Sequence, residues 1–443
     1  MSADTLTVRR SGPLRGNCRV PGDKSISHRA LLFGALADGV VEASGLGRGG
    51  DNLSTAAALR ALGVDITLAG DTARVRGVGF AGLAAAASAL DCGNSGTTIR
   101  LMMGLLAGRP FESELYGDAS LTRRPMRRVA EPLRRMGATI DGRVDPARPG
   151  DVFPPVRVRG GALAGIAYDL PVASAQLKSA LVLAGLQAKG KTTLREPGRS
   201  RDHTERMLGA MGAPIAVDAS GAVVVDPEGW NGKLRAIPIV IPGDLSSATF
   251  LFVAAATVAG SDVSVENVGL NPTRSGALDA LAAMGADIDI APEGDALGEP
   301  VGRVRVRASR LRGTRIAGEL ALRSLDEIPA LAVAAALAEG DTVFADLAEL
   351  RVKESDRIVA VARELRRAGV AVEERPDGLV VSGLGGRPPA GGTVQPEHDH
   401  RIAMAGAVMG LSAGDETAVP AADIATSFPS FADTLRALGA EIS

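Results

Sequence analysis

Residues 59–66 read Leu-Arg-Ala-Leu-Gly-Val-Asp-Ile, and this phrase decides the fold because it returns throughout the chain. The shared pattern is Leu, two variable residues, an apolar residue, Gly, Ala or Val, one variable residue, and Ile or Val. It is typical of an amphipathic helix that ends at a left-handed glycine and continues into a half-buried strand. Six copies, spaced 70 to 84 residues apart, predict six mixed α/β modules. The other copies are residues 133–140, 208–215, 281–288, 365–372 and 435–442.

A second feature accompanies the modules: a short polar string that leads into a helix too rich in Ala and Leu to lie on the surface. We expect these helices to be buried and to begin with capping residues. If the modules pack around a pseudo-threefold axis, the helices run parallel. Their N-termini, each worth about half a positive charge, then attract anions on one side. The six segments are residues 24–32, 94–101, 174–180, 246–251, 326–331 and 399–404.

The domain boundary is indicated by a match between residues 20–25, Val-Pro-Gly-Asp-Lys-Ser, and residues 241–246, Ile-Pro-Gly-Asp-Leu-Ser. Each string precedes a predicted buried helix, so we expect the chain to cross between two similar lobes near Pro21-Gly22 and Pro242-Gly243. Three modules then form an N-terminal lobe of residues 22–241. The C-terminal lobe combines residues 242–443 with residues 1–21, which are expected to return as an extra strand.

The overall composition excludes several classes of protein. A length of 443 residues suggests two or three domains, and a net charge of -2 gives no general field for nucleic acid or a membrane surface. No apolar secretory segment and no membrane-spanning run of about 18 residues are found, so we expect a cytoplasmic protein. We also expect a monomer. Two cysteines and four histidines give neither a disulfide framework nor zinc-ligand spacing.

Charged residues in the first half indicate an anion site. Lys24 and Arg29 lie at the start of an apolar helix, where an anionic ligand would compensate for their burial, unless they form a salt bridge, for instance to Asp23. Small residues at 94–98 suit close approach of a phosphate or carboxylate to free helix amides. The arginines of residues 123–128 suit bidentate binding of the same groups, or form a solvated basic loop. Further donors are Ser174, Gln176, Arg201 and His203.

In the second half, Asp326 precedes a helix with Pro329 in its first turn, and is either an N-cap or a general base beside a substrate hydroxyl. Residues 351–357 are dense in charge, although Glu354 and Arg357 have the spacing of an ordinary helical pair. Basic groups in both halves suit substrates that together carry several negative charges.

These residues resemble the 5-enolpyruvylshikimate-3-phosphate synthase family of enolpyruvyl transferases. The resemblance runs in order from about residue 15 to the C-terminus. It implies an α/β fold of two lobes, each of three βαβαββ units around buried parallel helices (an inside-out α/β barrel). It also implies transfer of the enolpyruvyl group of phosphoenolpyruvate to shikimate 3-phosphate, without cofactor or metal. The matching strings are residues 22–29, 93–97, 124–126, 174–179, 350–357 and 399–404.

Site residues follow from the resemblance by position. It implies that Asp326 accepts the hydroxyl proton, and that Glu354 and Lys24 exchange protons with the methylene carbon. The residues implied for shikimate 3-phosphate are Lys24, Ser25, Arg29, Ser174, Ala175, Gln176, Arg201, Asp326 and Lys353. Those implied for phosphoenolpyruvate are Lys24, Asn94, Gly96, Arg124, Gln176, Arg357 and Arg401. The herbicide glyphosate is expected to compete with phosphoenolpyruvate, because Gly96 leaves space for its greater length.

Two departures from the common bacterial pattern are Ala175 in place of Ser and Thr426 in place of Lys. Three other functions fit the sequence less well. The related UDP-N-acetylglucosamine transferases have Lys-Asn at residues 24–25 and a Cys within residues 111–124, which this chain lacks. RNA phosphate cyclases share the module type but need a basic RNA track. A non-catalytic repeat scaffold leaves the buried charges unexplained.

Overall fold

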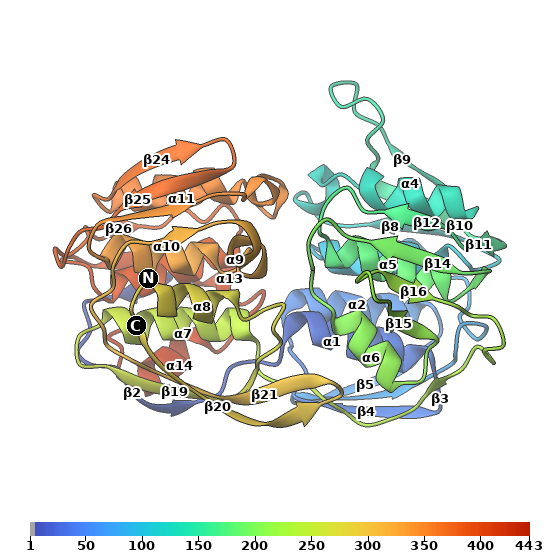
Figure 1. Cartoon of the computed structure of the whole chain (residues 1–443), viewed down its shortest axis with the longest axis horizontal. Coiled ribbons are helices and arrows are strands. Elements are labelled where there is room, and N and C mark those ends of the chain that lie inside the picture. Colours follow the sequence, from blue (N-terminus) through green and yellow to red (C-terminus); the bar gives the residue numbers. More distant parts are fainter. Residues whose placement is uncertain (1–4) are drawn as a thin grey trace. The chain divides into compact units, whose positions relative to one another are not determined.

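The computed structural model describes residues 5–443 and divides the chain into two compact units, each a mixed α/β structure (Figure 1). Unit 1 contains the chain up to Asp23, Pro242–Asp295 and Pro300–Ser443. Unit 2 contains Lys24–Ile241 together with Ala296–Glu299, the tip of a hairpin whose remaining residues belong to unit 1. Mixed α/β structure confirms the coarse fold class expected from the repeats.

Unit 2 is built from three four-stranded sheets of one pattern, in the orders β18-β4-β6-β5, β7-β8-β10-β9 and β12-β14-β16-β15. In each sheet the first pair is parallel and the other two are antiparallel. The sheet strands are β4 (Val40–Ser44), β5 (Asp65–Ala69), β6 (Thr72–Arg76), β7 (Leu90–Asp91), β8 (Glu112–Tyr116), β9 (Thr139–Arg143), β10 (Phe153–Arg159), β12 (Ala167–Asp169), β14 (Thr192–Arg195), β15 (Ile215–Val217), β16 (Val223–Val225) and β18 (Ile239–Val240). Two further parallel pairs join β3 (Ala37–Asp38) to β17 (Leu234–Arg235) and β11 (Leu163–Ala164) to β13 (Ala188–Lys189).

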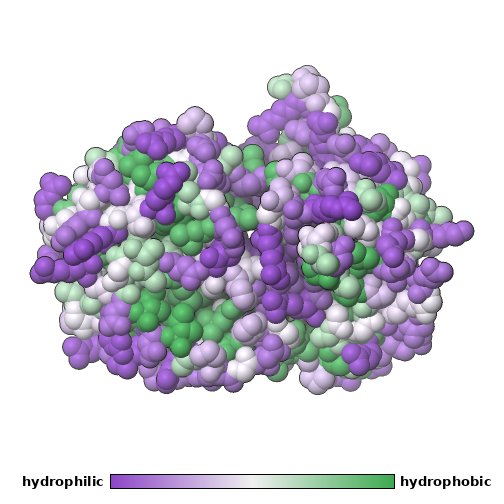
Figure 2. Space-filling model, viewed as in Figure 1, coloured by the Kyte–Doolittle hydropathy of each residue, from purple (hydrophilic) through white to green (hydrophobic). Residues whose placement is uncertain are grey.

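The helices of unit 2 are α1 (Lys24–Ala35), α2 (Gly50–Ala61), α3 (Gly96–Leu106), η1 (Leu121–Arg123), α4 (Arg127–Met136), α5 (Ala175–Gly185) and α6 (His203–Ala210). Buried side chains dominate α1, α3 and α5, as the sequence predicts. Helix α3 packs closely on α5 at Gly104, where a methyl group would overlap the backbone of Ala180. The turn between β9 and β10 projects at the top of Figures 1 and 2.

Unit 1 contains two four-stranded sheets, in the orders β2-β19-β21-β20 and β22-β23-β25-β24, and a three-stranded sheet, β1-β27-β26, which departs from the pattern. Its strands are β1 (Thr5–Val8), β2 (Arg15–Cys18), β19 (Asp262–Gly269), β20 (Asp287–Ala296), β21 (Glu299–Arg307), β22 (Arg315–Ile316), β23 (Asp341–Phe344), β24 (Ala371–Arg375), β25 (Gly378–Ser382), β26 (Gly392–Thr393) and β27 (Thr417–Pro420). Its helices are α7 (Leu245–Thr257), α8 (Gly276–Ala283), α9 (Gly318–Arg323), α10 (Ile328–Leu337), η2 (Ala348–Val352), α11 (Arg357–Arg367), α12 (His400–Gly410), α13 (Ala421–Ile424) and α14 (Phe431–Ala437).

Residues 5–20 contribute two strands rather than the single strand expected. Strand β1 pairs with β27 and β2 pairs with β19, so the segment joins two different sheets of unit 1. Pro13 lies between them, and because proline lacks a backbone N–H it favours an interruption of the strand there.

The six repeated phrases have the predicted local structure. Each glycine follows a helix in the positive-φ region: Gly63 (φ 90°), Gly137 (116°), Gly212 (85°), Gly285 (89°), Gly369 (82°) and Gly439 (100°). A strand follows the first five copies, and the sixth, residues 435–442, ends in a single bridge between Val8 and Ile442. Glycine adopts this conformation without the steric cost of a Cβ, so the phrase specifies the helix-to-strand turn.

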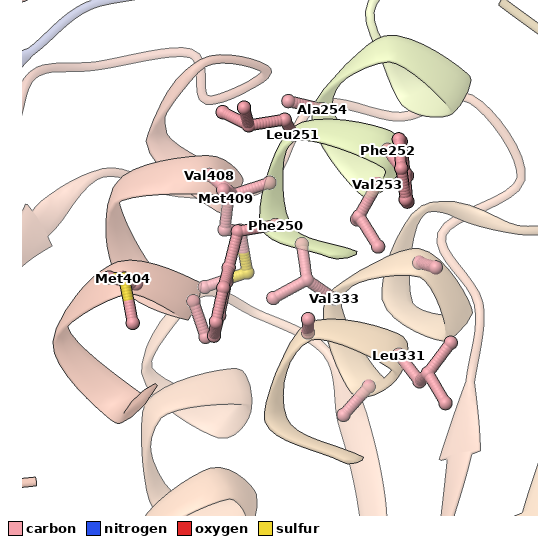
Figure 3. Packing of buried hydrophobic residues seen from close by; sticks show 14 of the residues in the cluster. Phe250, Leu251, Phe252, Val253, Ala254, Leu331, Val333, Met404, Val408 and Met409 are labelled. Atoms are coloured by element: carbon pink, nitrogen blue, oxygen red, sulfur yellow. The ribbon is translucent and has the colours of Figure 1, made fainter. Parts of the chain in front are cut away.

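The core of unit 1 lies where α7, α10 and α12 pack against one another. Figure 3 shows Phe250 of α7 between the other two helices, with Val333 of α10 and Val408 of α12 beside it. Every residue of α7 except Thr257 is buried, which confirms that these Ala-rich segments are core helices. Hydrophilic residues and smaller hydrophobic areas share the faces of the units seen in Figure 2. Within residues 5–443, the helices are too short or too polar to cross a membrane.

The expectation that all six core helices open with a capping side chain is only partly correct. Ser95, Ser174, Asp244 and Asp399 accept a backbone N–H at the starts of α3, α5, α7 and α12. Helix α10 begins instead after Glu327, whose side chain does not cap it. The N-cap interpretation of Asp326 is therefore wrong, because the carboxylate lies one residue too early.

Candidate active site

In unit 2, the first turn of α1 carries Lys24. Its Nζ lies 3.1 Å from the Asp51 carboxylate of α2, and the Asn52 amide donates to the Lys24 carbonyl. The salt bridge considered from the sequence therefore exists, but with Asp51 instead of Asp23, because Asp23 pairs with Arg274 in unit 1. The Lys24 side chain remains 18% exposed, so its ammonium group is accessible to a ligand.

Two arginines surround Gly96 at the N-terminus of α3. A Cβ at Gly96 would lie 2.7 Å from Arg100 Nη1 and 3.2 Å from Arg124 Nη1. Arg124 donates to Asn94 Oδ1 (2.6 Å), and Arg100 donates to Gln176 Oε1 (2.8 Å). Two guanidinium groups and the free amides of a helix start thus meet at a residue without a side chain. Such an arrangement binds a phosphate or carboxylate.

The buried Arg29 of α1 links α5 and α6. Its guanidinium donates to Ser179 Oγ and Thr204 Oγ1, both at 2.7 Å, and to the Ser25 carbonyl. Arg29 and its two hydroxyl partners are all buried. The α5 N-terminus, where Ser174 and Gln176 lie, is therefore held in position relative to Lys24 and Ser25 on α1.

A buried ion cluster around Lys178 also holds α5 in position. Lys178 Nζ of α5 lies 2.8 Å from the Glu196 carboxylate and 2.7 Å from the Glu205 carboxylate. The Ser200 hydroxyl donates to Glu196, one residue before Arg201. These contacts connect α5 to the loop that carries Arg201, so they fix both parts of the predicted sugar-phosphate site.

In unit 1, the start of α11 forms a dense ion network around Arg357, whose side chain is 1% exposed. Its nitrogens lie 3.1 Å from Asp326 Oδ1, 2.7 Å from Glu354 Oε2 and 2.8 Å from Asp399 Oδ2. Burial alone would lower the pKa of Arg357, but these carboxylates raise it above its ordinary value. Arg357 therefore remains charged and organises the carboxylates around it.

The Asp326 carboxylate is fixed by hydrogen bonds and is still partly exposed to solvent. Besides Arg357, it accepts a hydrogen bond from Lys353 Nζ at 3.2 Å, and its backbone carbonyl accepts one from Arg401 Nη1 at 3.0 Å. Its side chain is 14% exposed. Two cations hold this carboxylate in place, and a carboxylate held in this way is suited to accept a proton from a neighbouring hydroxyl.

The structure thus divides the predicted residues into two groups. One group lies at helix N-termini of unit 2, and the other surrounds Arg357 in unit 1. Residues 5–443 contain no cluster of His, Cys, Asp and Glu suited to a metal ion. The unit 2 group comprises Lys24, Ser25, Arg29, Asn94, Gly96, Arg124, Ser174, Ala175, Gln176 and Arg201, and the unit 1 group comprises Asp326, Lys353, Glu354, Arg357 and Arg401.

Sequence reasoning missed Arg100 and Asp399 as members of these groups. Arg100 follows Gly96 by four residues on a helix, so this spacing alone would place it over the glycine. The sequence predicts Asp399 only as the cap of its helix, which it is, but Asp399 also pairs with Arg357 from 42 residues away. Thr426 is half-buried just after α13.

Comparisons with known proteins agree on one family. The model for EPSP synthase (3-phosphoshikimate 1-carboxyvinyltransferase) matches residues 8–435. The chain is 52% identical over 440 residues to the 3-phosphoshikimate 1-carboxyvinyltransferase of Desulforudis audaxviator, covering 99% of this chain and 100% of that protein. It is 51% identical over 440 residues to the protein of that name from Synechococcus sp. (strain JA-3-3Ab), covering 99% and 97%.

Solved structures give the same result. EPSP synthase from Acinetobacter baumannii has a TM-score of 0.86 and 41% identity, with 100% of this chain and 99% of that chain covered. The enolpyruvyl transferase NikO from Streptomyces tendae has a TM-score of 0.80 over 100% and 99% of the two chains. At 20% identity, that likeness shows the fold alone. The match over nearly the whole length and the identity of about one half to the curated relatives show that this chain belongs to the EPSP synthase (3-phosphoshikimate 1-carboxyvinyltransferase) family.

Proposed function

We propose that this protein transfers the enolpyruvyl group of phosphoenolpyruvate to the 5-hydroxyl of shikimate 3-phosphate and releases phosphate. The reaction belongs to chorismate and aromatic amino acid biosynthesis. The observation that carries the proposal is the pair of arginines around Gly96, together with Lys24, because this group suits a small substrate with both phosphate and carboxylate charges. Family membership supports the same activity.

In unit 2, we propose that phosphoenolpyruvate contacts Lys24, Asn94, Gly96, Arg124 and Gln176. Arg100 joins this set on the evidence of its contact distance to the Gly96 position. The unit 2 residues proposed for shikimate 3-phosphate are Lys24, Ser25, Arg29, Ser174, Ala175, Gln176 and Arg201. Ser174 and Gln176 offer a hydroxyl and an amide at a helix start, which suits a polyhydroxylated phosphate ester.

In unit 1, the same proposal assigns Asp326 and Lys353 to shikimate 3-phosphate, and Arg357 and Arg401 to phosphoenolpyruvate. Addition begins when an acid protonates the methylene carbon of the enol and the 5-hydroxyl oxygen bonds to the neighbouring carbon. Asp326 accepts the hydroxyl proton, and the product is a tetrahedral ketal phosphate.

Elimination completes the reaction. The carbon–oxygen bond to phosphate breaks, and a proton leaves the methyl carbon to restore the enol. Glu354 and Lys24 are proposed for these carbon-bound protons. The arginines stabilise the charge on the departing phosphate, which is the electrostatic role that preorganised donors perform best.

We further propose the finer architecture expected from the repeats, with domains of residues 22–241 and of residues 1–21 plus 242–443. Each domain would contain three βαβαββ units around parallel buried helices. The sheets support this proposal. In each of the five four-stranded sheets, one parallel pair is followed in the strand order by two antiparallel pairs. The three-stranded sheet β1-β27-β26 has one antiparallel pair and one parallel pair. The contact division near Asp23 and Pro242 agrees with crossovers at Pro21-Gly22 and Pro242-Gly243.

The activity is tested by measuring phosphate release from phosphoenolpyruvate with shikimate 3-phosphate and, separately, with UDP-N-acetylglucosamine. Release is expected with the first acceptor only. Release with the nucleotide sugar alone would assign the chain to the other enolpyruvyl transferases. Product identity is checked by mass, since hydrolysis of phosphoenolpyruvate also releases phosphate.

Glyphosate is expected to inhibit competitively against phosphoenolpyruvate, and Gly96→Ala is expected to weaken that inhibition. The added methyl would displace the Arg100 guanidinium, which lies 2.7 Å from the Cβ position. Overpacking of this kind costs about 1 to 3 kcal/mol, or about one to two decades in affinity. The longer inhibitor should lose more than the substrate, so the inhibition constant should rise more than KM. Equal changes in both constants would contradict the placement of the inhibitor beside Gly96.

A further inference from the structure

Unit 2 contains a cavity of about 530 Å³ at the opposite end of its core helices from the candidate site. Its wall includes residues 36–38, just after α1, and residues 186–187, just after α5. Helix α1 has 12 residues, which corresponds to a length of about 18 Å between Lys24 and the cavity. The volume lies in the range of about 300–1,000 Å³ typical of small-molecule sites. The residues proposed for the two substrates do not line it.

One side of the cavity is aromatic. Phe80 and Trp230 meet edge to face, with ring centroids 6.3 Å apart and an interplanar angle of 83°. Trp230 is the only tryptophan in a chain whose aromatic content is 3%. An apolar, planar ligand would find favourable contacts on this wall.

The cation Arg109 also lines the cavity, beside Phe80. Its Nε donates to Gln187 Oε1 at 2.9 Å, its Nη1 donates to the Phe80 carbonyl, and its guanidinium carbon lies 5.9 Å from the Phe80 ring centroid. Burial lowers the pKa of this group from its ordinary value. Among residues 5–443, no carboxylate forms a salt bridge with Arg109, so its protein partners are neutral groups.

A structural role for Arg109 would be to donate hydrogen bonds to the free carbonyls at the C-termini of α3 and α5. Gln187 already satisfies part of that need, because its amide donates to the carbonyls of Leu105 on α3 and Leu183 on α5. Arg109 contacts the oxygen of that amide and not the helix carbonyls themselves. At the rim, Lys233 and Asp38 pair at 2.9 Å and leave the charge of Arg109 uncompensated.

We propose that this cavity binds a small organic carboxylate with a planar, apolar body. The carboxylate would pair with the Arg109 guanidinium, and the ring would lie against Phe80 and Trp230. A guanidinium gives a carboxylate two parallel hydrogen bonds, which explains why arginine suits this position better than lysine. The inference is independent of the transferase activity, because the cavity lies at the C-terminal ends of α1, α3 and α5, whereas Lys24, Gly96 and Gln176 lie at their N-terminal ends.

The test is a fluorescence titration of the full-length protein with phenylacetate, using Trp230 as the reporter. We expect a saturable change, and binding at least about tenfold weaker for the neutral analogue 2-phenylacetamide, because the charge-assisted hydrogen bonds to Arg109 are lost. Acetate, which has the charge without the ring, should cause no saturable change. Equal responses to phenylacetate and its amide would overturn the proposal.

Arg109→Gln is expected to reduce phenylacetate affinity by about tenfold or more, while the matched control Arg74→Gln, an exposed residue of the same unit, keeps it. Unchanged affinity in Arg109→Gln would show that the guanidinium does not bind the carboxylate and would overturn the proposal. If that variant does not fold, calorimetric titration of Trp230→Leu decides the question. Loss of the aromatic wall should weaken binding, and undiminished affinity there would reject the site.

Discussion

Replacement of Asp326 by asparagine is expected to lower kcat by about two to four orders of magnitude while the fold is kept. The amide has the size of the carboxylate, and its oxygen still accepts the hydrogen bonds from Lys353 and Arg357, at 3.2 and 3.1 Å in the native protein. It cannot accept the hydroxyl proton. Arg357 retains Glu354 and Asp399 as ion-pair partners, so the buried cation is not left uncompensated.

Steady-state phosphate release at saturating concentrations of both substrates measures this effect. The matched control is Asp341→Asn, which changes an exposed carboxylate of the same unit and should leave kcat unchanged. If Asp326 only positions Lys353 and Arg357, KM for shikimate 3-phosphate will rise and kcat will remain near the native value. That result would remove Asp326 from the role of base.

The repeated phrases were predictable because their information is local. A glycine after an amphipathic helix and before an alternating strand specifies a positive φ, and all six glycines, from Gly63 to Gly439, have it. Burial of the Ala-rich helices was equally accessible, since a helix apolar on all sides needs a core. The starts of helices were less predictable. Asp326 lies one residue before the N-cap position, and boundaries of this kind depend on competing contacts in the folded chain.

The partners of the charged residues were not predictable, because they come from distant parts of the chain. The sequence indicated that Lys24 needs compensation but did not identify Asp51, 27 residues away, as its partner. Arg274 is the clearest omission. It lies in an Asn-Pro-Thr-Arg string that does not resemble the other motifs. It nevertheless pairs with Asp23, 251 positions away, and with Asp244, 30 positions away.

Arg274 connects the two segments at which the chain passes between its units. Its guanidinium lies 3.1 Å from the Asp23 carboxylate and 2.9 Å from the Asp244 carboxylate, and the side chain is 4% exposed. The backbones of the two segments also pair, because Asp23 N donates to the Pro242 carbonyl and Asp244 N to the Pro21 carbonyl. Glu327 is the third carboxylate near Arg274, at 3.8 Å.

Arg274 is the cation that lies close to all three carboxylates of the cluster. Burial raises the pKa of Asp244, and so does the nearby Asp23, while Arg274 acts in the opposite direction. Without Arg274, three buried carboxylates would remain close together, and removing one partner of a buried ion cluster typically costs about 3–5 kcal/mol. The methionine variant Arg274→Met keeps most of the side-chain volume, so its cost reports the charge and not a cavity.

Arg274→Met is therefore expected to destabilise unit 1 by about 3–5 kcal/mol at neutral pH, and by less as the pH falls. The sign follows from Asp244, whose folded-state pKa is raised above the ordinary value of 3.8 by burial and by Asp23, and would rise further without the opposing effect of Arg274. Between those values the folded state binds more protons than the unfolded state, so protonation favours folding as the pH decreases. Hydrogen exchange of α7 amides measures unit 1, while Trp230 fluorescence during denaturation reports unit 2 separately. Arg305→Met, which removes an exposed pair with Asp262, is the control and should change little. An unchanged α7 exchange rate, or a deficit that grows toward low pH, would show that Arg274 does not hold the carboxylates of the two crossing segments.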